Sequence, residues 1–285
     1  MGASPLSWND NKTDDFETSI LCFEKKFFTF VRVFRIFTNK FKYNTMQSRR
    51  DFIKRASLMV AGGIVAPNLI SSCGGPSKYL GLQLYSLREM VTDDGIQKVL
   101  KLVAKMGYNS LETASYNDGK FYGETPADFK KMVNDLGMRL TSSHLGRNIS
   151  GDHDADMAWW NKAVEAHNAA GMKYMIMPSS PLKGEGATLD NIKRYGDYFN
   201  EIGLISAGAS VQFGYHNHEF EFENKVDGVP VFDLMLENTS ADHVLYELDV
   251  YWIKKGGYDP VDYMKKYPKR IKVLHIKDET AIGAQ

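Results

Sequence analysis

The chain has 285 residues, and its 35 lysines and arginines balance its 35 aspartates and glutamates. The first 72 residues hold 11 of the basic and 6 of the acidic side chains, so the remainder has a net charge of −5. A mildly acidic body has no general attraction for a phosphate backbone, which argues against a nucleic-acid partner.

Residues 1–45 show no hydrophobic period that predicts a domain. Met46 stands just before a pair of arginines, where an export signal begins. We therefore expect residues 1–45 to be a non-native or disordered leader, with translation starting at Met46. The alternative is a helix on a membrane surface, and the intact mass of the unprocessed precursor separates the two. That helix would use Phe27, Phe28, Phe30, Phe34 and Phe37.

Residues 46–73 resemble a twin-arginine export signal that ends in a lipoprotein box. Residues 48–54 read SRRDFIK, a short apolar stretch runs from 56 to 70, and Ile-Ser-Ser precedes Cys73. The stretch is too short and too rich in Gly, Ala and Ser for a membrane span. We expect lipid-modified Cys73 to anchor a periplasmic lipoprotein to the membrane. With Cys22 in the leader, no cysteine remains for a disulfide or a thiolate metal site.

From residue 74 onward, strand-like and helix-like segments alternate. This alternation predicts right-handed crossovers and a parallel sheet, and no glycine-rich phosphate loop follows any strand. A closed α/β barrel of the TIM (β/α)8 type is therefore favoured over an open dinucleotide-binding sheet. The strand-like runs are 80–85, 109–114, 138–144, 173–177, 211–215, 243–249 and 271–276. The helix-like segments are 94–106, 126–137, 156–170, 189–207, 231–237 and 260–266, with Asp94 expected to cap the first.

An eight-stranded barrel needs one more strand and helix after these seven units. The sequence stops nine residues after the last strand-like run, at Gln285. We therefore expect residues 74–285 to form a barrel domain that is truncated after its seventh strand. Such a domain has two open sheet edges and is expected to be marginally stable on its own.

Polar residues end three of the strand-like runs, where a buried strand has no use for an unpaired polar group. In extended geometry these residues form pairs that share one face of each strand. If those faces point into the barrel, imidazoles and carboxylates meet at the carboxyl ends of the strands, where barrel enzymes keep their chemistry. Such donors suit one divalent ion, Mn²⁺, Mg²⁺, Zn²⁺ or Co²⁺. The pairs are His216 with His218, Glu247 with Asp249, and His275 with Lys277.

Five segments of the chain carry a family resemblance. They are GLQLYSLR at 81–88, SLETA at 110–114, GYHNHEFEF at 214–222, ELDVYW at 247–252 and LHIKD at 274–278. In combination they resemble the sugar phosphate isomerase/epimerase family. That family belongs to the xylose-isomerase-like barrel superfamily, which also contains AP endonuclease family 2. The resemblance implies a TIM barrel that holds one divalent metal ion.

The resemblance also implies the metal ligands and the reaction. Matched position by position, the ligands are His216, Asp249 and His275, and a fourth ligand, a glutamate of the eighth strand, would fall beyond Gln285. The family reaction removes a proton next to the carbonyl of a sugar or keto-sugar, which gives isomerisation or epimerisation. The missing glutamate would be one of the bases, so this truncated chain is expected to be weakly active or inactive.

Other side chains are candidates for proton transfer and substrate contact. The nearest catalytic candidates are Glu112, His218 and Glu219. Glu112 and His144 each end a strand-like run. They contact sugar hydroxyls, hold a further metal ion, or have only a structural role. Trp252 either stacks on a sugar face or packs in the core. The candidates for substrate binding are Tyr85, His144, Trp252 and Lys277, the last of which could instead pair with Asp249.

Three alternative functions stay open. His216 stands where simple ketose epimerases carry a glutamate, which favours keto-sugar or inosose substrates and includes relatives that eliminate water. A zinc-dependent repair endonuclease would need a histidine three residues after Asp249, and Trp252 occupies that position. A non-catalytic sugar-binding lipoprotein is the third alternative. The remaining histidines, His153, His167 and His243, are expected to be structural.

Overall fold

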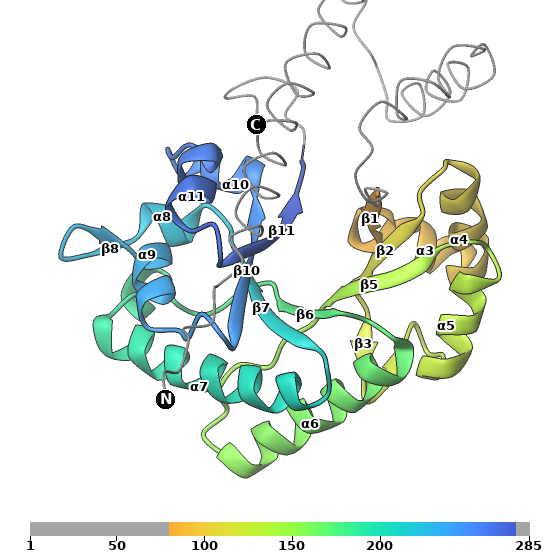
Figure 1. The fold of residues 1–285 in the computed structure, drawn as a ribbon, viewed down its shortest axis with the longest axis horizontal. Coiled ribbons are helices and arrows are strands. Elements are labelled where there is room, and N and C mark those ends of the chain that lie inside the picture. The colour runs from red at the N-terminus through yellow and green to blue at the C-terminus, as the bar shows by residue number, and fades with distance from the viewer. Residues whose placement is uncertain (1–79, 278–285) are drawn as a thin grey trace, which may run out of the picture. The chain divides into compact units, whose positions relative to one another are not determined.

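The computed structural model describes residues 80–277, all of them within the expected barrel domain. One parallel sheet of seven strands runs in the order β1-β2-β5-β6-β7-β10-β11. Figure 1 shows this sheet curled into a half-barrel, with helices around its outer side and with β1 and β11 as its edge strands. The predicted α/β barrel-type fold is confirmed. The leader at 1–45, the export signal at 46–73 and Cys73 lie outside the described residues.

The seven strands correspond one to one to the seven predicted runs. Strand β10 is buried at all six positions, as expected for a parallel strand covered on both faces. The first run, by contrast, is a strand only at its start, because buried Leu84 begins the 3-10 helix η1 (Leu84–Leu87). The strand bounds are β1 Gly81–Gln83, β2 Ser110–Thr113, β5 Arg139–His144, β6 Tyr174–Met177, β7 Gln212–His216, β10 Val244–Asp249 and β11 Ile271–His275.

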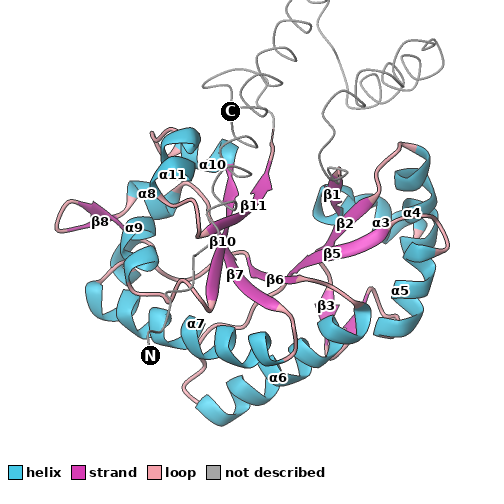
Figure 2. Cartoon of the chain, viewed as in Figure 1, coloured by secondary structure: helices cyan, strands magenta, loops and turns pink. Residues whose placement is uncertain are grey.

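The helices cover the outer side of the sheet, as the colouring in Figure 2 shows. Their starts follow local sequence: Thr125 and Thr188 each accept a backbone N–H at a helix N-terminus. The helices are α3 Arg88–Asp94, α4 Ile96–Lys105, α5 Pro126–Asn134, α6 His153–Ala170, α7 Leu189–Gly208, α8 Phe220–Glu223, α9 Val231–Glu237, α10 Val250–Lys255 and α11 Pro260–Lys266. Smaller elements are the hairpins of β3 Tyr116–Asn117 with β4 Lys120–Phe121 and of β8 Lys225–Val226 with β9 Val229–Pro230, and the 3-10 helix η2 Gly184–Gly186.

The first helical segment differs from its prediction. Asp94 was expected to cap a helix, but it is the last residue of α3, and α4 begins only after Gly95. The φ angle of Gly95 is 79°, a left-handed value that glycine adopts without strain and that interrupts the helix. Asp94 instead accepts a hydrogen bond from the ammonium of Lys98, one turn further along.

The register of the strands places polar side chains at one rim of the half-barrel. Glu247 of β10 is opposite His216 of β7, and Asp249 of β10 is opposite His275 of β11. Because all seven strands are parallel, their carboxyl ends meet at this rim. The apolar core lies elsewhere, in two clusters: one includes residues of α6, α7 and α9, and the other includes residues of α4 and α5.

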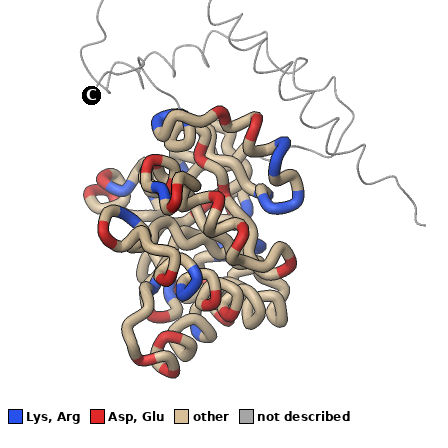
Figure 3. The backbone as a smooth tube through the Cα atoms, turned by 90° about the vertical axis from the view of Figure 1, so that its left-hand side faces the viewer, with Lys and Arg blue, Asp and Glu red and all other residues tan. Residues whose placement is uncertain are grey.

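Figure 3 shows acidic and basic positions interspersed along the chain in that view. None of the helices within residues 80–277 combines the length and the apolar character that crossing a bilayer requires.

Helix α7 approaches the sheet closely at Gly203. A β-carbon at this position would lie 2.4 Å from the carbonyl oxygen of His243, whereas one at Gly208 in the same helix would meet nothing within 4 Å. The backbone of His243 leads into β10, so the absence of a side chain at Gly203 sets how closely α7 packs on the sheet.

We predict that Gly203→Ala lowers the free energy of unfolding by about 1–3 kcal/mol, because the helix must move away from β10. Gly208→Ala is the matched control and should be neutral or stabilising by up to about 1 kcal/mol, since alanine favours a helix. Urea unfolding followed by circular dichroism measures both changes. Equal stability of the two variants would contradict the close contact.

His167 of α6 is a buried, neutral histidine. It is fully buried, its Nδ1 lies 2.6 Å from the carbonyl oxygen of Ala163, and its Nε2 has no hydrogen-bond partner. Its ring contacts those of Tyr116 and Phe121. Burial lowers the pKa of His167 to about 4 from its ordinary 6.5. The histidine therefore belongs to the core, as the sequence suggested.

We predict that this burial makes the fold sensitive to acid. The unfolded chain binds a proton at His167 below about pH 6.5 and the folded chain only near pH 4, so stability is lost as the pH falls between these values, by up to about 3 kcal/mol. Urea unfolding at about pH 7 and about pH 5 should show a smaller loss for His167→Leu than for the wild type. The control variant His153→Gln removes an exposed histidine, and its stability should still fall between these two pH values as fully as that of the wild type. An identical pH dependence in His167→Leu would refute the prediction.

Candidate metal centre

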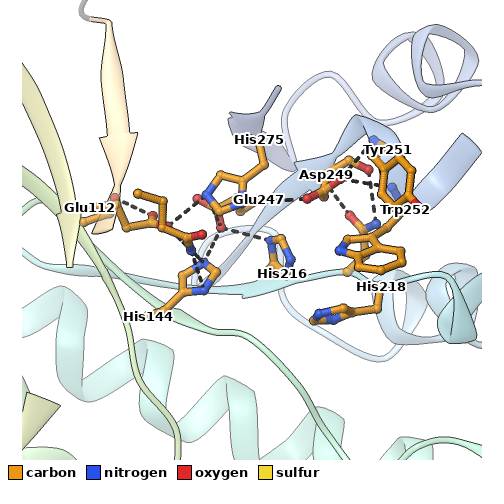
Figure 4. Close-up of polar contacts among 12 residues, drawn as sticks. Glu112, His144, His216, His218, Glu247, Asp249, Tyr251, Trp252 and His275 are labelled. Carbon is orange, nitrogen blue, oxygen red and sulfur yellow. Dashed lines mark hydrogen bonds and ion pairs between the residues drawn. The ribbon is translucent and has the colours of Figure 1, made fainter. Parts of the chain in front are cut away.

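Six polar side chains from six strands meet at the carboxyl rim of the half-barrel. Figure 4 shows most of them converging from opposite sides of the curled sheet. They are Gln83 of β1, Glu112 of β2, His144 of β5, His216 of β7, Glu247 of β10 and His275 of β11. Because these strands follow one another around the sheet, only its curvature brings the first and the last close together.

Four of the six form a group with the spacing of metal ligands. His144, His216, Glu247 and His275 each offer one ligand atom, and these atoms lie within 4.8 Å of one another. The Oε2 atom of Glu247 is at the centre: it lies 2.6 Å from Nε2 of His144, 3.1 Å from Nδ1 of His216 and 3.2 Å from Nε2 of His275. We call these four residues the His3Glu group.

The His3Glu group fits a divalent cation by its chemistry. Glu247 is completely buried, and its second oxygen, Oε1, has no hydrogen-bond partner among the described residues. An unpartnered carboxylate oxygen in a buried site is costly, and a cation would satisfy it. Three imidazole nitrogens with one carboxylate are typical ligands of Zn²⁺, Co²⁺ or Mn²⁺.

Charges within the group compensate one another. Burial opposes ionisation of Glu247, but His144 and His275 outweigh it and lower the Glu247 pKa. Burial also opposes protonation of His275, yet hydrogen bonding to Glu112 and the charge of Glu247 raise its pKa to about 9. His216 differs, because burial and the neighbouring His144 and His275 hold its pKa well below the ordinary value. One imidazole is thus kept neutral, the form that binds a metal.

Glu112 supplies a second carboxylate beside the His3Glu group. Its Oε1 accepts a hydrogen bond from Nε2 of Gln83 at 2.8 Å and lies 2.9 Å from Nε2 of His275. Its Oε2 accepts a hydrogen bond from the Ser142 hydroxyl at 2.6 Å. The carboxylate is therefore fixed from two sides, in direct contact with a candidate ligand. The sequence predicted Glu112 as catalytic but gave no indication of Gln83, the first polar residue of β1.

Asp249 lies next to the His3Glu group and not in it. Its Oδ1 accepts the backbone N–H groups of Tyr251 and Trp252 and so caps helix α10. Its Oδ2 is 3.9 Å from Nδ1 of His275. Glu247 is two residues earlier on the same face of β10, and its longer side chain reaches the three imidazoles. The sequence placed both carboxylates on this face, while only the packed strands show that Glu247 occupies the centre.

The predicted substrate-contact residues lie in different places. His144, predicted to contact a substrate or a metal, is one of the His3Glu group. Trp252 is half-buried, with its ring centroid 5.4 Å from that of His218. The Lys277 ammonium lies 4.2 Å above the Trp252 ring. Tyr85 is exposed, and its ring is covered by the Arg88 guanidinium at 4.5 Å; no described contact joins it to the group.

The turn after β7 holds two further predicted residues. The ring of His218 is 5.0 Å from that of His216, and burial lowers its pKa despite the opposing charge of Glu219. The carboxylate of Glu219 points to Lys255, with which it pairs at 3.1 Å. The turn is therefore next to the His3Glu group, with His218 as its nearer titratable side chain.

Glu221 is a buried acid that the sequence analysis did not single out. It is completely buried in α8, accepts the backbone N–H of His218 at 2.7 Å and accepts the Tyr215 hydroxyl at 2.6 Å. Burial raises its pKa to about 8. These two hydrogen bonds fix the backbone that carries His218. The sequence offered only a weak signal, an acidic residue between two phenylalanines.

Comparisons with known proteins agree with this geometry. The family described as xylose isomerase-like TIM barrel matches residues 100–284. A crystal structure of a sugar phosphate isomerase/epimerase from Parabacteroides distasonis ATCC 8503 is 37% identical, with a TM-score of 0.64 over 73% of this chain and 77% of that one. Inosose dehydratase from Geobacillus kaustophilus (strain HTA426) is 24% identical over 220 residues, 71% of this chain and 67% of its own. The IOLI protein, crystallised with a zinc atom, shares the fold at 14% identity, with a TM-score of 0.55 over 70% of this chain and 73% of that one. The chain belongs to the xylose isomerase-like TIM barrel family.

Proposed function

We propose that this protein is a divalent-metal-dependent isomerase or epimerase of a sugar, keto-sugar or inosose. The observation that carries the proposal is the His3Glu group, whose ligand atoms lie within 4.8 Å of one another beside the fixed carboxylate of Glu112. The names of the isomerase/epimerase and dehydratase relatives support this class of substrate. The zinc in the IOLI structure supports the metal.

The metal and the side chains have separate tasks in this proposal. A bound divalent ion supplies Lewis-acid polarisation of a substrate carbonyl. Glu112 then accepts the proton from the carbon next to that carbonyl and returns it. Gln83 and Ser142 hold the Glu112 carboxylate in place, so it loses little freedom when substrate binds.

His218 is the proposed partner of Glu112 in proton transfer. Figure 4 shows Glu112 and His218 on opposite sides of His216 and His275. Two proton-transfer groups on opposite sides of one carbon allow a proton to leave from one face and return to the other, which is epimerisation. Glu219 is a weaker candidate, because its carboxylate is already paired with Lys255.

The inosose dehydratase relative favours a second candidate reaction. It begins with the same proton removal next to a carbonyl, followed by loss of the β-hydroxyl group, so that the two lost groups leave as water. Glu112 would accept this proton and a second, protonated side chain would donate its own proton to the departing hydroxyl, after which Glu112 releases a proton to solvent and the second side chain takes one up. Nuclear magnetic resonance of the product separates this reaction from epimerisation.

We predict that replacing a member of the His3Glu group weakens metal binding. Glu247→Gln and His275→Gln should each lower zinc affinity at least about 10-fold in equilibrium dialysis with metal analysis, because each removes one ligand. His153→Gln replaces an exposed imidazole in α6 and should retain wild-type affinity. Asp249→Asn tests the sequence-based ligand: a loss as large as that of Glu247→Gln would assign the carboxylate ligand to Asp249 as well. Unchanged affinity in both Glu247→Gln and His275→Gln would refute the site.

We predict that Glu112→Gln abolishes proton exchange while metal stays bound. In deuterated water, the wild type with metal should exchange the C–H next to the carbonyl of at least one keto-sugar or inosose in a test panel. Glu112→Gln should reduce that rate about 100-fold or more, because an amide does not accept the proton. The control Glu89→Gln changes an exposed acid of α3 and should have no effect. Exchange that continues at the wild-type rate in Glu112→Gln, or after removal of the metal by a chelator, would contradict the mechanism; no exchange at all would leave a sugar-binding protein.

A further inference from the structure

A row of cations and rings passes beside the metal centre, and an exposed lysine stands at each of its ends. Its members contact one another in sequence and come from four parts of the chain: the β6–α7 loop, the turn after β7 with the first residue of α8, helix α10, and the residues after β11. The members are Lys183, Phe220, His218, Trp252 and Lys277, which we call the cation–aromatic row. Figure 4 shows its middle, with His218 and Trp252 beside His216.

The contacts within the row are close and ordered. The rings of His218 and Phe220 are stacked, with centroids 5.7 Å apart and planes 9° apart. The ring of Trp252 lies 5.4 Å from that of His218. The Lys183 ammonium lies 5.4 Å above Phe220, and the Lys277 ammonium lies 4.2 Å above Trp252. The two cations therefore stand at the two ends of a wall of three rings, and the central ring is 5.0 Å from His216.

Neither terminal ammonium is neutralised by an ion pair with a carboxylate in residues 80–277. Both side chains are exposed. The carboxylate of Asp249 caps α10 and forms no ion pair with Lys277 in this part of the chain. Two unneutralised positive charges thus lie around one wall of the site.

Lys255 provides a contrast within the same wall. Its ammonium also lies over the Trp252 ring, at 4.9 Å, but it is 3.1 Å from the Glu219 carboxylate. Lys255 and Lys277 therefore cover the same ring, but within residues 80–277 only the charge of Lys255 is paired with a carboxylate. Among the three lysines over these rings, charge neutralisation therefore distinguishes Lys255 from Lys183 and Lys277.

We propose that the cation–aromatic row is a subsite for an oxyanion, a carboxylate or a phosphate ester, carried by the substrate at the end away from the metal centre. This inference rests on the proposed function, because it assumes that the carbonyl end lies at the His3Glu group. The rings provide an apolar wall for the carbon skeleton, and the ammonium group at one end of the row binds the anion as a point charge. A neutral sugar would leave both charges without a counter-ion.

The test compares three probes that differ in charge and share a glucose skeleton. D-Glucose 6-phosphate carries a phosphate ester, D-gluconate carries a carboxylate, and D-glucose is neutral. Isothermal titration calorimetry measures their binding to the wild type, to Lys183→Met, to Lys277→Met and to the double variant. Methionine keeps a flexible apolar chain over the ring and removes the charge. Lys255→Met is the matched control, because it removes a cation from the same ring but one that is already paired.

We expect at least one anionic probe to bind the wild type more tightly than D-glucose, and more weakly at high ionic strength. Lys183→Met or Lys277→Met, according to which end of the row holds the anion, should weaken that binding about 10-fold, the usual effect of one hydrogen bond to a charged group, and the double variant should lose at least as much. Lys255→Met should change it less than about twofold, as expected for an exposed pair. The phosphate and carboxylate probes show which oxyanion is preferred. Neither anion binding better than D-glucose, or equal anion binding by the double variant and the wild type, would overturn the proposal.

The same titrations separate this proposal from the proposed reaction. Anion binding without proton exchange on any substrate would keep the subsite and remove the reaction. Proton exchange without selective anion binding would keep the reaction and remove the subsite.

Discussion

One buried carboxylate organises the rim of the half-barrel. Glu247 is completely enclosed, and one of its oxygens lies within 3.2 Å of three imidazole nitrogens. A charge in such a place must be compensated, because an isolated ion in a protein interior is costly. The imidazoles around Glu247 provide that compensation, and two of them also contact the neighbouring carboxylate of Glu112. The four groups of the centre therefore depend on one another.

The position of Glu247 is a property of the whole sheet. Glu247 contacts His144, 103 residues before it in the sequence, and His275 contacts Glu112 across 163 residues. Neighbouring strands supply His216 and His275 through their register with β10. The opposite side, from β2 and β5, arrives only because the sheet curls. Helix α7 packs closely at Gly203 against the backbone that leads into β10.

The surroundings of the centre divide into fixed and exposed parts. Glu112 is held by Gln83 and Ser142, and the turn carrying His218 is held by buried Glu221. These contacts keep proton-transfer candidates in place beside the metal ligands, as catalysis by positioned groups requires. On the outer side, the cation–aromatic row extends toward solvent with its charges exposed. The proposed proton transfer thus belongs to the fixed part, and the proposed anion subsite belongs to the exposed part.

The sequence alone determined the seven strands, their parallel order and the rim at which His216 and His275 meet, because alternating apolar runs and the polar residues at their ends are local signals. It also placed Glu247 and Asp249 on one face of their strand, since side chains alternate along a strand. The family resemblance named Asp249 as the ligand, whereas in the structure Glu247 belongs to the His3Glu group and Asp249 lies beside it. That choice depended on the depth of each side chain in the curled sheet and on the competing use of Asp249 as a helix cap. The contribution of Gln83, the central place of His144 and the role of buried Glu221 were likewise decided only by tertiary structure, because each depends on contacts between segments far apart in the chain or on burial that no local pattern encodes.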